Sequence, residues 1–324
     1  MDPAYAGYEK AAYVLLPVPY DGTSTYVKGA DKGPQALIDA SDSIELYDVE
    51  EDYEPYLDGI HTSSPVVTGS ETPEEMVAAV RARTAEVLRD GKMAVVLGGE
   101  HSVSAGSIAA YAEKYPDLSV LQLDAHADMR DSYQGSPYNH ACVMRRVKEI
   151  CPVVQVGIRS VCIEEKDELD PRTTVYAHQL EKESGWMERA ISGLTENVYL
   201  TIDLDAFDPS LLPSTGTPFP GGMRWRQVLD TVDAVSASRN IVGFDIVELC
   251  PNPHDKSSDV LAAVLLYKIL AKIGKRSGDA DKGLGKGAAF PSAAARAGGS
   301  AGHQTYHGAF YGSECALCLA SSRR

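Results

Sequence analysis

Short apolar runs rich in β-branched residues alternate along the chain with segments of helical periodicity, and this alternation constrains the fold most strongly. The runs show little polar alternation, which indicates strands that are buried on both faces. Between them, Pro73 to Arg89 places apolar side chains near one side of a helix, and Ser258 is positioned to cap a helix that runs to about Ile273. The pattern predicts an α/β fold with a mostly parallel central sheet and helices on both faces. The expected strands are Ala12 to Leu16, Ala94 to Leu97, Ser119 to Leu123, Val153 to Val156, Val198 to Ile202 and Ile241 to Val247.

The charge of the chain excludes several classes of partner. Thirty Lys and Arg against 46 Asp and Glu give a net charge of −16, which repels nucleic-acid phosphates and attracts small cations. No uncharged apolar stretch approaches the roughly 18 residues of a membrane helix, and Met1 to Lys10 lacks the basic start of a secretory signal. The six cysteines are too scattered for a disulfide framework and are expected to be reduced thiols. We therefore expect a cytoplasmic protein with no nucleic-acid or membrane partner.

Composition divides the chain into two parts. Residues 275–324 contain 9 Gly, 11 Ala and 6 Ser without sustained apolar periodicity, which is typical of a low-complexity, disordered tail. Residues 1–274 are compatible with a single α/β catalytic domain. The tail holds His303, His307, Cys315 and Cys318, but their spacing is loose for a zinc site and chance is the preferred interpretation.

Acidic and imidazole side chains directly follow four of the predicted strands. Ligands gather at the carboxyl ends of strands in such sheets. Because side chains at i, i+2 and i+4 of an extended segment project to one face, each cluster can converge on one point. A lone Asp directly after a strand is more often a helix cap. Helix capping does not easily explain the two clusters at 124–128 and 203–205, which together hold five acidic or imidazole residues. The strand ends read Gly98-Gly99-Glu100-His101-Ser102, Asp124-Ala125-His126-Ala127-Asp128, Asp203-Leu204-Asp205 and Glu248.

The donor set at these strand ends favours a pair of metal ions. Four carboxylates packed at the edge of the core would repel one another at a cost of several kcal/mol, and a multivalent cation removes that conflict. Carboxylates and imidazoles without a thiolate suit Mn(II) better than Fe, Co, Ni or Zn. Six ligands exceed the need of one catalytic ion, whereas two neighbouring ions would use all six and lower the pKa of a shared water. The candidate metal ligands are His101, Asp124, His126, Asp128, Asp203 and Asp205.

The remaining local features have simpler interpretations. Gly98-Gly99 lacks the spacing of a phosphate-binding loop, so we expect these glycines to let the backbone turn and direct His101 toward the metal site. His61, His178 and His254 belong to no cluster and are expected to be surface or packing residues.

Taken together, the motifs resemble the ureohydrolase family of arginases and agmatinases. The resemblance runs from Pro17-Val-Pro-Tyr20 to about Lys272 and keeps all metal motifs in order. It implies the three-layer arginase-type α/β fold, a homo-oligomer and two Mn(II) ions. The stretches that carry it are Gly98 to Ser102, Asp124 to Asp128, Tyr133-Gln-Gly-Ser-Pro-Tyr-Asn-His140-Ala-Cys142, Thr201-Ile-Asp203-Leu-Asp205-Ala-Phe-Asp208-Pro209, Thr215-Gly-Thr-Pro218 and Phe244-Asp-Ile-Val-Glu248.

The same resemblance assigns a role to each residue. His140 would be the proton shuttle, and Glu248 would receive the guanidinium group of a small cationic substrate. Imidazole can pass protons at neutral pH, and a carboxylate pairs with a guanidinium through two hydrogen bonds; the alternatives are a loop histidine with no role and a helix cap. Asp128 joins these two in the catalytic set. For the metals, the resemblance implies that His101 and Asp128 hold one ion, that His126 and Asp205 hold the other, and that Asp124 and Asp203 bridge both.

The substrate is less strongly constrained than the chemistry. Met129-Arg130-Asp131-Ser132-Tyr133 is similar to agmatinases rather than arginases, which favours agmatine, cleaved to putrescine and urea in polyamine biosynthesis. The acidic body also suits a dicationic substrate. Phe219, however, stands where agmatinases commonly have Glu, so guanidinobutyrate, guanidinopropionate and arginine stay open. Two other classes remain as rivals, a metallophosphoesterase and an inactive ureohydrolase-like binding protein.

Overall fold

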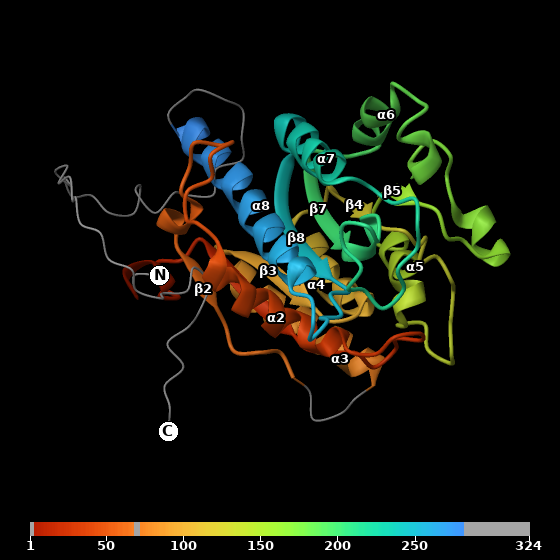
Figure 1. The fold of residues 1–324 in the computed structure, drawn as a ribbon, viewed down its shortest axis with the longest axis horizontal. Helices are drawn as coiled ribbons and strands as arrows, with labels where there is room; N and C mark the ends of the chain where they lie inside the picture. Colours follow the sequence, from red (N-terminus) through yellow and green to blue (C-terminus); the bar gives the residue numbers. More distant parts are fainter. Residues whose placement is uncertain (1–2, 68–71, 282–324) are drawn as a thin grey trace.

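A single parallel sheet forms the centre of the protein in a computed structural model that describes residues 3–67 and 72–281 (Figure 1). Within those residues the sheet has eight strands in the order β2-β1-β3-β8-β7-β4-β5-β6, and every neighbouring pair is parallel. Parallel strands require long crossover connections, and helices supply them here. The strands are β1 (Tyr13–Val18), β2 (Ile60–Thr62), β3 (Met93–Gly98), β4 (Leu118–Leu123), β5 (Val153–Ile158), β6 (Thr174–Tyr176), β7 (Asn197–Asp203) and β8 (Asn240–Val247).

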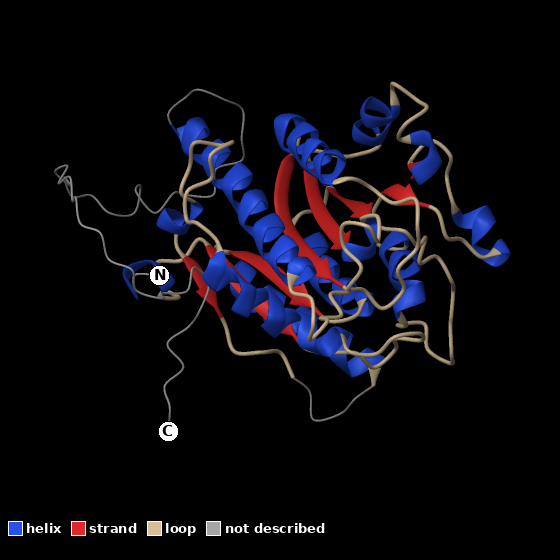
Figure 2. Ribbon diagram, viewed as in Figure 1, coloured by secondary structure: helices blue, strands red, loops and turns tan. Residues whose placement is uncertain are grey.

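Helices cover both faces of the sheet and complete three layers (Figure 2). Along β1 the side chains alternate between two cores: Tyr13 and Leu15 pack on one face, and Val14 and Leu16 pack on the other. The first core includes α2 (Gly33–Ala40), α6 (Trp186–Ser192), α7 (Trp225–Ser238) and α8 (Ser257–Asp281), and the second includes α3 (Pro73–Arg89), α4 (Ser104–Lys114) and α5 (Val143–Lys148). The short α1 (Pro3–Ala6) precedes β1. Burial on both faces explains why the strands are apolar throughout.

The structure confirms the predicted elements of the interior. All six predicted strands are present as β1, β3, β4, β5, β7 and β8. The helix α3 has the predicted bounds, its predicted apolar face is buried, and Thr72 caps it by accepting the backbone N–H of Glu75. Sequence patterning missed β2 and β6, which are three residues each and form the two edges of the sheet.

The last helix differs from its prediction. α8 begins at Ser257 and continues to Asp281, past the expected end at Ile273 and into the segment predicted as a tail. Ser258 is not a cap but lies inside the first turn, where its hydroxyl accepts the backbone N–H of Ser214. The rest of the predicted tail, with His303, His307, Cys315 and Cys318, lies outside the described residues.

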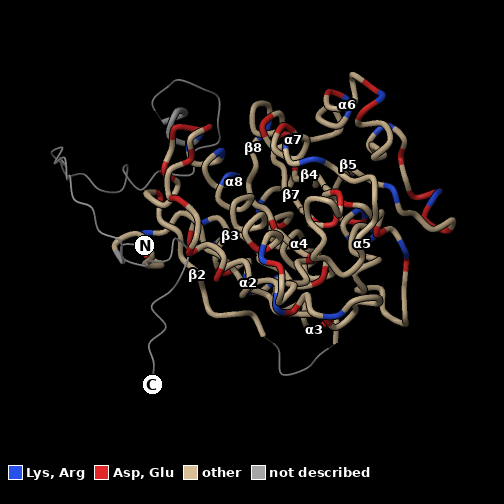
Figure 3. Tube along the Cα trace, in the orientation of Figure 1, with Lys and Arg blue, Asp and Glu red and all other residues tan. Residues whose placement is uncertain are grey.

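Ion pairs fix α8 to the neighbouring elements. Lys268 donates to Asp48 at 3.0 Å and Lys272 donates to Glu51 at 2.8 Å, while Lys272 also pairs with Asp233 of α7. Lys and Arg are interspersed with Asp and Glu elsewhere along the chain (Figure 3). None of the described helices combines the length and apolar composition that a bilayer crossing needs. The cysteines of the described segments, Cys142, Cys151, Cys162 and Cys250, are all free thiols, as predicted for them.

The order of strands determines where the polar side chains meet. The four strands predicted to end in acidic or imidazole residues, β3, β8, β7 and β4, are consecutive in the sheet. Since they are parallel, their carboxyl ends lie side by side at the same end of the sheet. The fold therefore brings the four predicted clusters together.

Candidate metal centre

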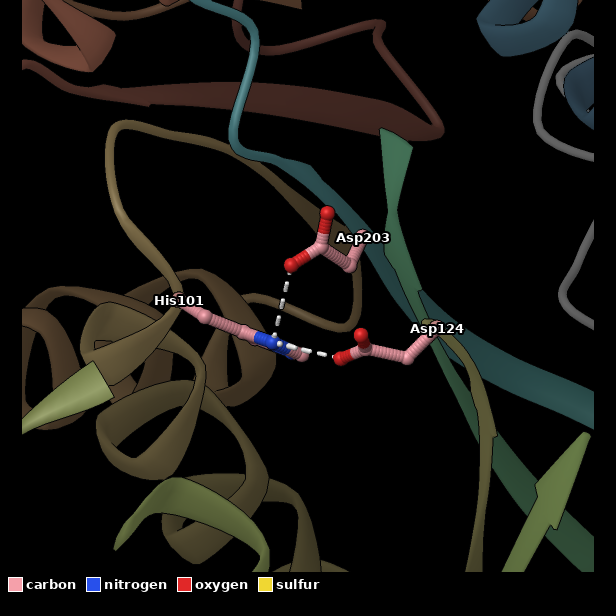
Figure 4. Close-up of side chains that lie close together, drawn as sticks. All are labelled: His101, Asp124 and Asp203. Carbon is pink, nitrogen blue, oxygen red and sulfur yellow. Dashed lines mark ion pairs between the residues drawn. The ribbon is translucent and has the colours of Figure 1, made fainter. Parts of the chain in front are cut away.

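One group of donors surrounds His101 at the carboxyl ends of the central strands. We call it the inner group, and it consists of His101, Asp124, Asp128 and Asp203. His101 follows β3, and its Nδ1 lies 3.1 Å from Asp124 Oδ2, 3.1 Å from Asp128 Oδ2 and 3.5 Å from Asp203 Oδ2. Figure 4 shows the side chains of Asp124 and Asp203 pointing toward the imidazole of His101. All of these side chains are buried. The geometry brings an imidazole and three carboxylates to one point.

A second group, the outer group, consists of His126, Asp205 and the shared Asp124. His126 Nδ1 lies 2.9 Å from Asp205 Oδ2 and 3.7 Å from Asp124 Oδ1. The His126 side chain is 27% exposed, whereas Asp124 and Asp205 are fully buried. Asp124 therefore faces His101 with one carboxylate oxygen and His126 with the other, as a bridging ligand requires.

A hydrogen-bond chain behind His101 fixes which ring nitrogen faces the carboxylates. His101 Nε2 is 2.9 Å from Thr201 Oγ1, and Thr201 donates to Asp245 Oδ1 at 2.6 Å. Tyr199 donates its hydroxyl hydrogen to the other oxygen of Asp245 at 2.9 Å. Because Thr201 donates to the carboxylate, it accepts from His101, and Nε2 is the protonated nitrogen. A backing of this kind orients metal-binding histidines and leaves the other nitrogen as the ligand.

The inner group passes a direct test of fit to a metal ion. Nδ1 of His101 is buried and lacks a hydrogen bond of acceptable geometry within the described part of the chain, although carboxylate oxygens lie 3.1 Å away. A buried polar atom without a partner is costly. The donor types, imidazole nitrogen and carboxylate oxygen, are those that Mn(II) and related divalent ions accept. Residues 101, 124, 126, 128, 203 and 205 thus fit a metal centre.

The pKa values of these side chains indicate that both groups hold more negative charge than their histidines can balance. Burial, together with the carboxylates of Asp205 and Asp128, raises the pKa of Asp124 to about 7. Burial by itself would lower the pKa of His126, but the carboxylates of Asp205 and Asp124 outweigh it and raise that pKa to about 11. Burial and the neighbouring Asp205 likewise raise the pKa of Asp203 well above its usual range. Both groups therefore favour added positive charge, which a divalent cation supplies.

Close packing explains the two glycines that precede His101. A Cβ at Gly99 would overlap the backbone of Tyr20, and a Cβ at Gly98 would lie 2.7 Å from side-chain atoms of Val103 and Val247. Neither glycine has a positive φ. The backbone bends at Gly99 as predicted, and close approach to neighbouring elements is a further reason for the two glycines.

Two predicted catalytic residues have unusual backbone conformations. Asp128 has φ 54° and Glu248 has φ 67°, in the left-handed region that non-glycine residues rarely adopt. Such strain is common where a side chain must be aimed at a functional site. Glu248 accepts the backbone N–H of His101 at 2.8 Å, and burial together with Glu100 raises the pKa of its carboxyl group well above the usual range.

A cavity of about 170 Å³ opens beside the two donor groups. Its lining includes His101, His126, Asp128 and Asp203, together with His140 and Glu248, so the catalytic residues predicted from separate motifs share one space with the donors. A larger surface groove of about 1220 Å³ contains none of the predicted site residues, and we assign the chemistry to the smaller cavity for that reason. His61, His178 and His254 do not line the smaller cavity, in agreement with their predicted surface or packing roles.

Comparison with known proteins identifies the family. A sequence model of the arginase family matches residues 11–271. The chain belongs to the arginase family. An N(1)-aminopropylagmatine ureohydrolase from Synechocystis is 37% identical over 282 residues, which cover 84% of this chain and 92% of that protein. An agmatinase from Pyrococcus horikoshii is 32% identical over 268 residues, which cover 80% of this chain and 91% of that protein.

A solved structure confirms the fold of this arginase-family protein. Agmatine ureohydrolase from Thermoplasma volcanium superimposes with a TM-score of 0.76 at 31% identity, covering 85% of this chain and 94% of that chain. The predicted arginase-type α/β fold is therefore confirmed, and the chain is an arginase-family hydrolase. The arginase family is metal-dependent, which agrees with the two donor groups.

Sequence reasoning missed the residues that support the donors of this family member. Thr201 had a detectable signal, because it stands two residues before Asp203 and so lies on the same face of β7. Asp245 is an acid inside the apolar run of β8, which is a second signal. Glu100 had the signal of an acid that directly follows β3, but it was given no role. Thr23 had no signal, since its contacts with Glu100 and His140 join distant loops.

Proposed function

We propose that this arginase-family hydrolase uses two Mn(II) ions to cleave the guanidino group of an amine, with agmatine as the first candidate, to urea and putrescine. One observation carries the proposal: two donor groups share Asp124 and lie beside a cavity lined by His140 and Glu248. That arrangement provides metal ligands, a proton carrier and a carboxylate for a cation in one space.

The six donors divide between the two ions in the proposed enzyme. His101 and Asp128 would hold one ion, His126 and Asp205 the other, with Asp124 and Asp203 between them. Asp203 directs Oδ2 toward His101, while its Oδ1 accepts the backbone N–H of Asp205 at 2.8 Å. Because these contacts place only one of its oxygens beside a donor histidine, the bridging role of Asp203 is part of the proposal. Bound divalent ions supply Lewis acidity and lower the pKa of a shared water.

Glu248 and His140 act on the substrate itself. The Glu248 carboxyl group is buried, and its ionised form is favoured when a cation approaches it. A guanidinium pairs with such a carboxylate through two parallel hydrogen bonds, which would orient the carbon to be attacked. His140 lines the same cavity and would protonate the departing amine. Arg130, whose guanidinium lies 4.6 Å from the ring centroid of Tyr133, also lines the cavity and adds positive charge there.

A second candidate substrate, N(1)-aminopropylagmatine, is favoured by one observation. The relative at 37% identity acts on that compound according to its name, whereas the agmatinase relative is 32% identical. Phe219 does not line the cavity; the residue is 41% exposed, and its carbonyl oxygen accepts a hydrogen bond from Arg159 at 2.7 Å. Position 219 therefore provides no carboxylate in the cavity to pair with the free amine of agmatine. The cavity instead contains Glu165.

Urea release from a panel of substrates tests the proposal. The panel contains agmatine, N(1)-aminopropylagmatine, guanidinobutyrate, guanidinopropionate and arginine, each assayed with the Mn(II)-loaded protein. We expect the highest kcat/KM for agmatine or its aminopropyl derivative. A higher value for arginine or a guanidino acid would overturn the substrate assignment. Loaded protein that releases urea from none of them but phosphate from an ester would favour the metallophosphoesterase, and neither activity would favour a binding protein.

A further inference from the structure

The hydroxyl group of Thr23 joins His140 to the buried carboxylate of Glu100. Thr23 Oγ1 lies 2.7 Å from Glu100 Oε1 and 3.2 Å from His140 Nδ1, and it accepts the backbone N–H of His140 at 2.9 Å. Glu100 is fully buried and also accepts the backbone N–H groups of Thr23 at 3.2 Å and Ser102 at 2.8 Å. The three side chains come from the loops that follow β1, β3 and β4. They form a connected network at the wall of the cavity.

The acceptors in this network decide which ring nitrogen of His140 carries the proton. Glu100 Oε1 already accepts the backbone N–H of Thr23, and Thr23 directs its one hydroxyl hydrogen to the same oxygen. Thr23 Oγ1 then has only acceptor capacity left for His140 Nδ1. Nδ1 is therefore protonated, and Nε2 carries the lone pair of the neutral ring.

The other nitrogen of His140 is left for a ligand in the cavity. His140 lines the cavity together with Glu248 and His126. Within residues 3–67 and 72–281, no protein group forms a hydrogen bond with His140 Nε2, whereas Nδ1 is held by Thr23. The ring of Tyr133 meets the imidazole edge-on, with ring centroids 6.3 Å apart. The imidazole is thus held on one side and open on the other.

We propose that Thr23 and Glu100 are positioning residues that hold His140 as the Nδ1–H tautomer, so that Nε2 exchanges the proton in turnover. This inference rests on the proposed ureohydrolase function. His140 takes up at Nε2 one proton released by the water that hydrolyses the guanidino group and becomes a cation, and that proton moves to the amine nitrogen as its bond to the guanidino carbon breaks. The Nδ1–H bond to Thr23 persists throughout. The imidazole ends each cycle neutral, with no net gain of protons.

Thr23→Val removes the hydroxyl group while keeping the shape of the side chain. We expect kcat for the best guanidino substrate to fall about 10- to 100-fold, the usual effect of losing such a supporting hydrogen bond, with KM and bound metal unchanged. Thr23→Ser restores the hydroxyl group and should restore kcat. Equal kcat in Thr23→Val and the unaltered enzyme, or failure of Thr23→Ser to recover it, would overturn the proposal.

Thr84→Val is the matched control for loss of a buried hydroxyl group. Thr84 lies in α3, away from the cavity lining, and its Oγ1 has no hydrogen-bond partner among the described residues. This variant should keep full activity. A loss of kcat as large as that of Thr23→Val would mean that any such substitution disturbs the enzyme, and would count against a specific role for Thr23.

A direct measurement of the tautomer does not depend on turnover. In protein labelled with ¹⁵N-histidine, the His140 signals, identified by their loss in His140→Gln, should show a protonated Nδ1 and an unprotonated Nε2 in the neutral ring. Thr23→Val should shift them toward a mixture of tautomers. A protonated Nε2 in the unaltered protein would overturn the inference. Absence of urea from every substrate would instead refute the proposed function, while the NMR result would still decide the tautomer.

Discussion

The inner and outer donor groups share Asp124 but differ in their surroundings. In the inner group His101 is 1% exposed, and Thr201 and Asp245 hold its Nε2 from behind. In the outer group His126 is 27% exposed and faces the cavity. A ligand set that is locked by buried partners is preorganised for its ion, whereas an exposed one can exchange with solvent. The comparison teaches that two groups of the same donor types can differ in burial and in the hydrogen bonds that hold their histidines.

The largest expected effect is that of removing the shared ligand. Asp124→Ala takes a donor from both groups, so we expect loss of both ions and a fall in kcat/KM of at least about 10³-fold. Metal analysis and urea release measure the two effects. The exposed Asp39 gives a matched control, since Asp39→Ala should retain metal and activity. Retention of both ions by Asp124→Ala would end the idea that the two groups share a ligand.

Replacing the two histidines separately distinguishes the groups. His126→Ala should lose the outer ion and activity, but the metal-free fold should lose less stability than in His101→Ala, because water can reach this partly exposed site. His101→Ala should lower the free energy of unfolding of metal-free protein by about 1–3 kcal/mol, since it removes the buried hydrogen bond that Thr201 accepts from His101. Urea denaturation of both variants after metal removal measures this difference. Equal stability of the two variants would contradict the contrast in burial.

Removing the support of His101 should have a smaller effect than removing His101. Thr201→Val keeps all six donors but deletes the hydroxyl group between His101 and Asp245. We expect metal affinity of the inner group to fall about 10- to 100-fold, with the outer group unchanged. Titration with Mn(II) should then resolve one weakened site. If the weakened site belongs to the outer group, as judged in the His126→Ala background, the assignment of Thr201 is wrong.

The smallest expected effect concerns the rate of metal loss in the unaltered protein. A chelator should remove the two ions in separate phases, with the outer ion leaving first because only its histidine is partly exposed. Stopped-flow detection with a metal-sensitive dye follows the release. A single phase that carries both ions would show that burial does not separate the groups kinetically.

The interior of the fold could be predicted from sequence, and its edges could not. Strands such as β4 and β7 are buried on both faces, which gives continuous apolar runs with a clear beginning and end. β2 and β6 are three residues long, too short for any period to emerge. The end of α8 was missed because its last residues fall in a segment whose composition indicates disorder.

The donors of the site were predictable for a related reason, and their supports were not. A polar residue that directly follows an apolar strand, such as Asp124 or Asp203, is conspicuous, and parallel strands bring such residues to one edge. The contact between Thr23 and His140 joins residues 117 positions apart in different loops. No local pattern encodes a contact of that kind, because loop geometry alone determines it.

Metal content of the purified, active enzyme tests the central claim most directly: that six donors from separate strand ends hold a pair of ions. Elemental analysis should be made on protein that releases urea from agmatine or its aminopropyl derivative, after extensive dialysis against metal-free buffer. We predict two equivalents of Mn(II) or another divalent transition ion for each chain, falling to one in His126→Ala. Full urea release by protein with no bound transition metal would contradict the account.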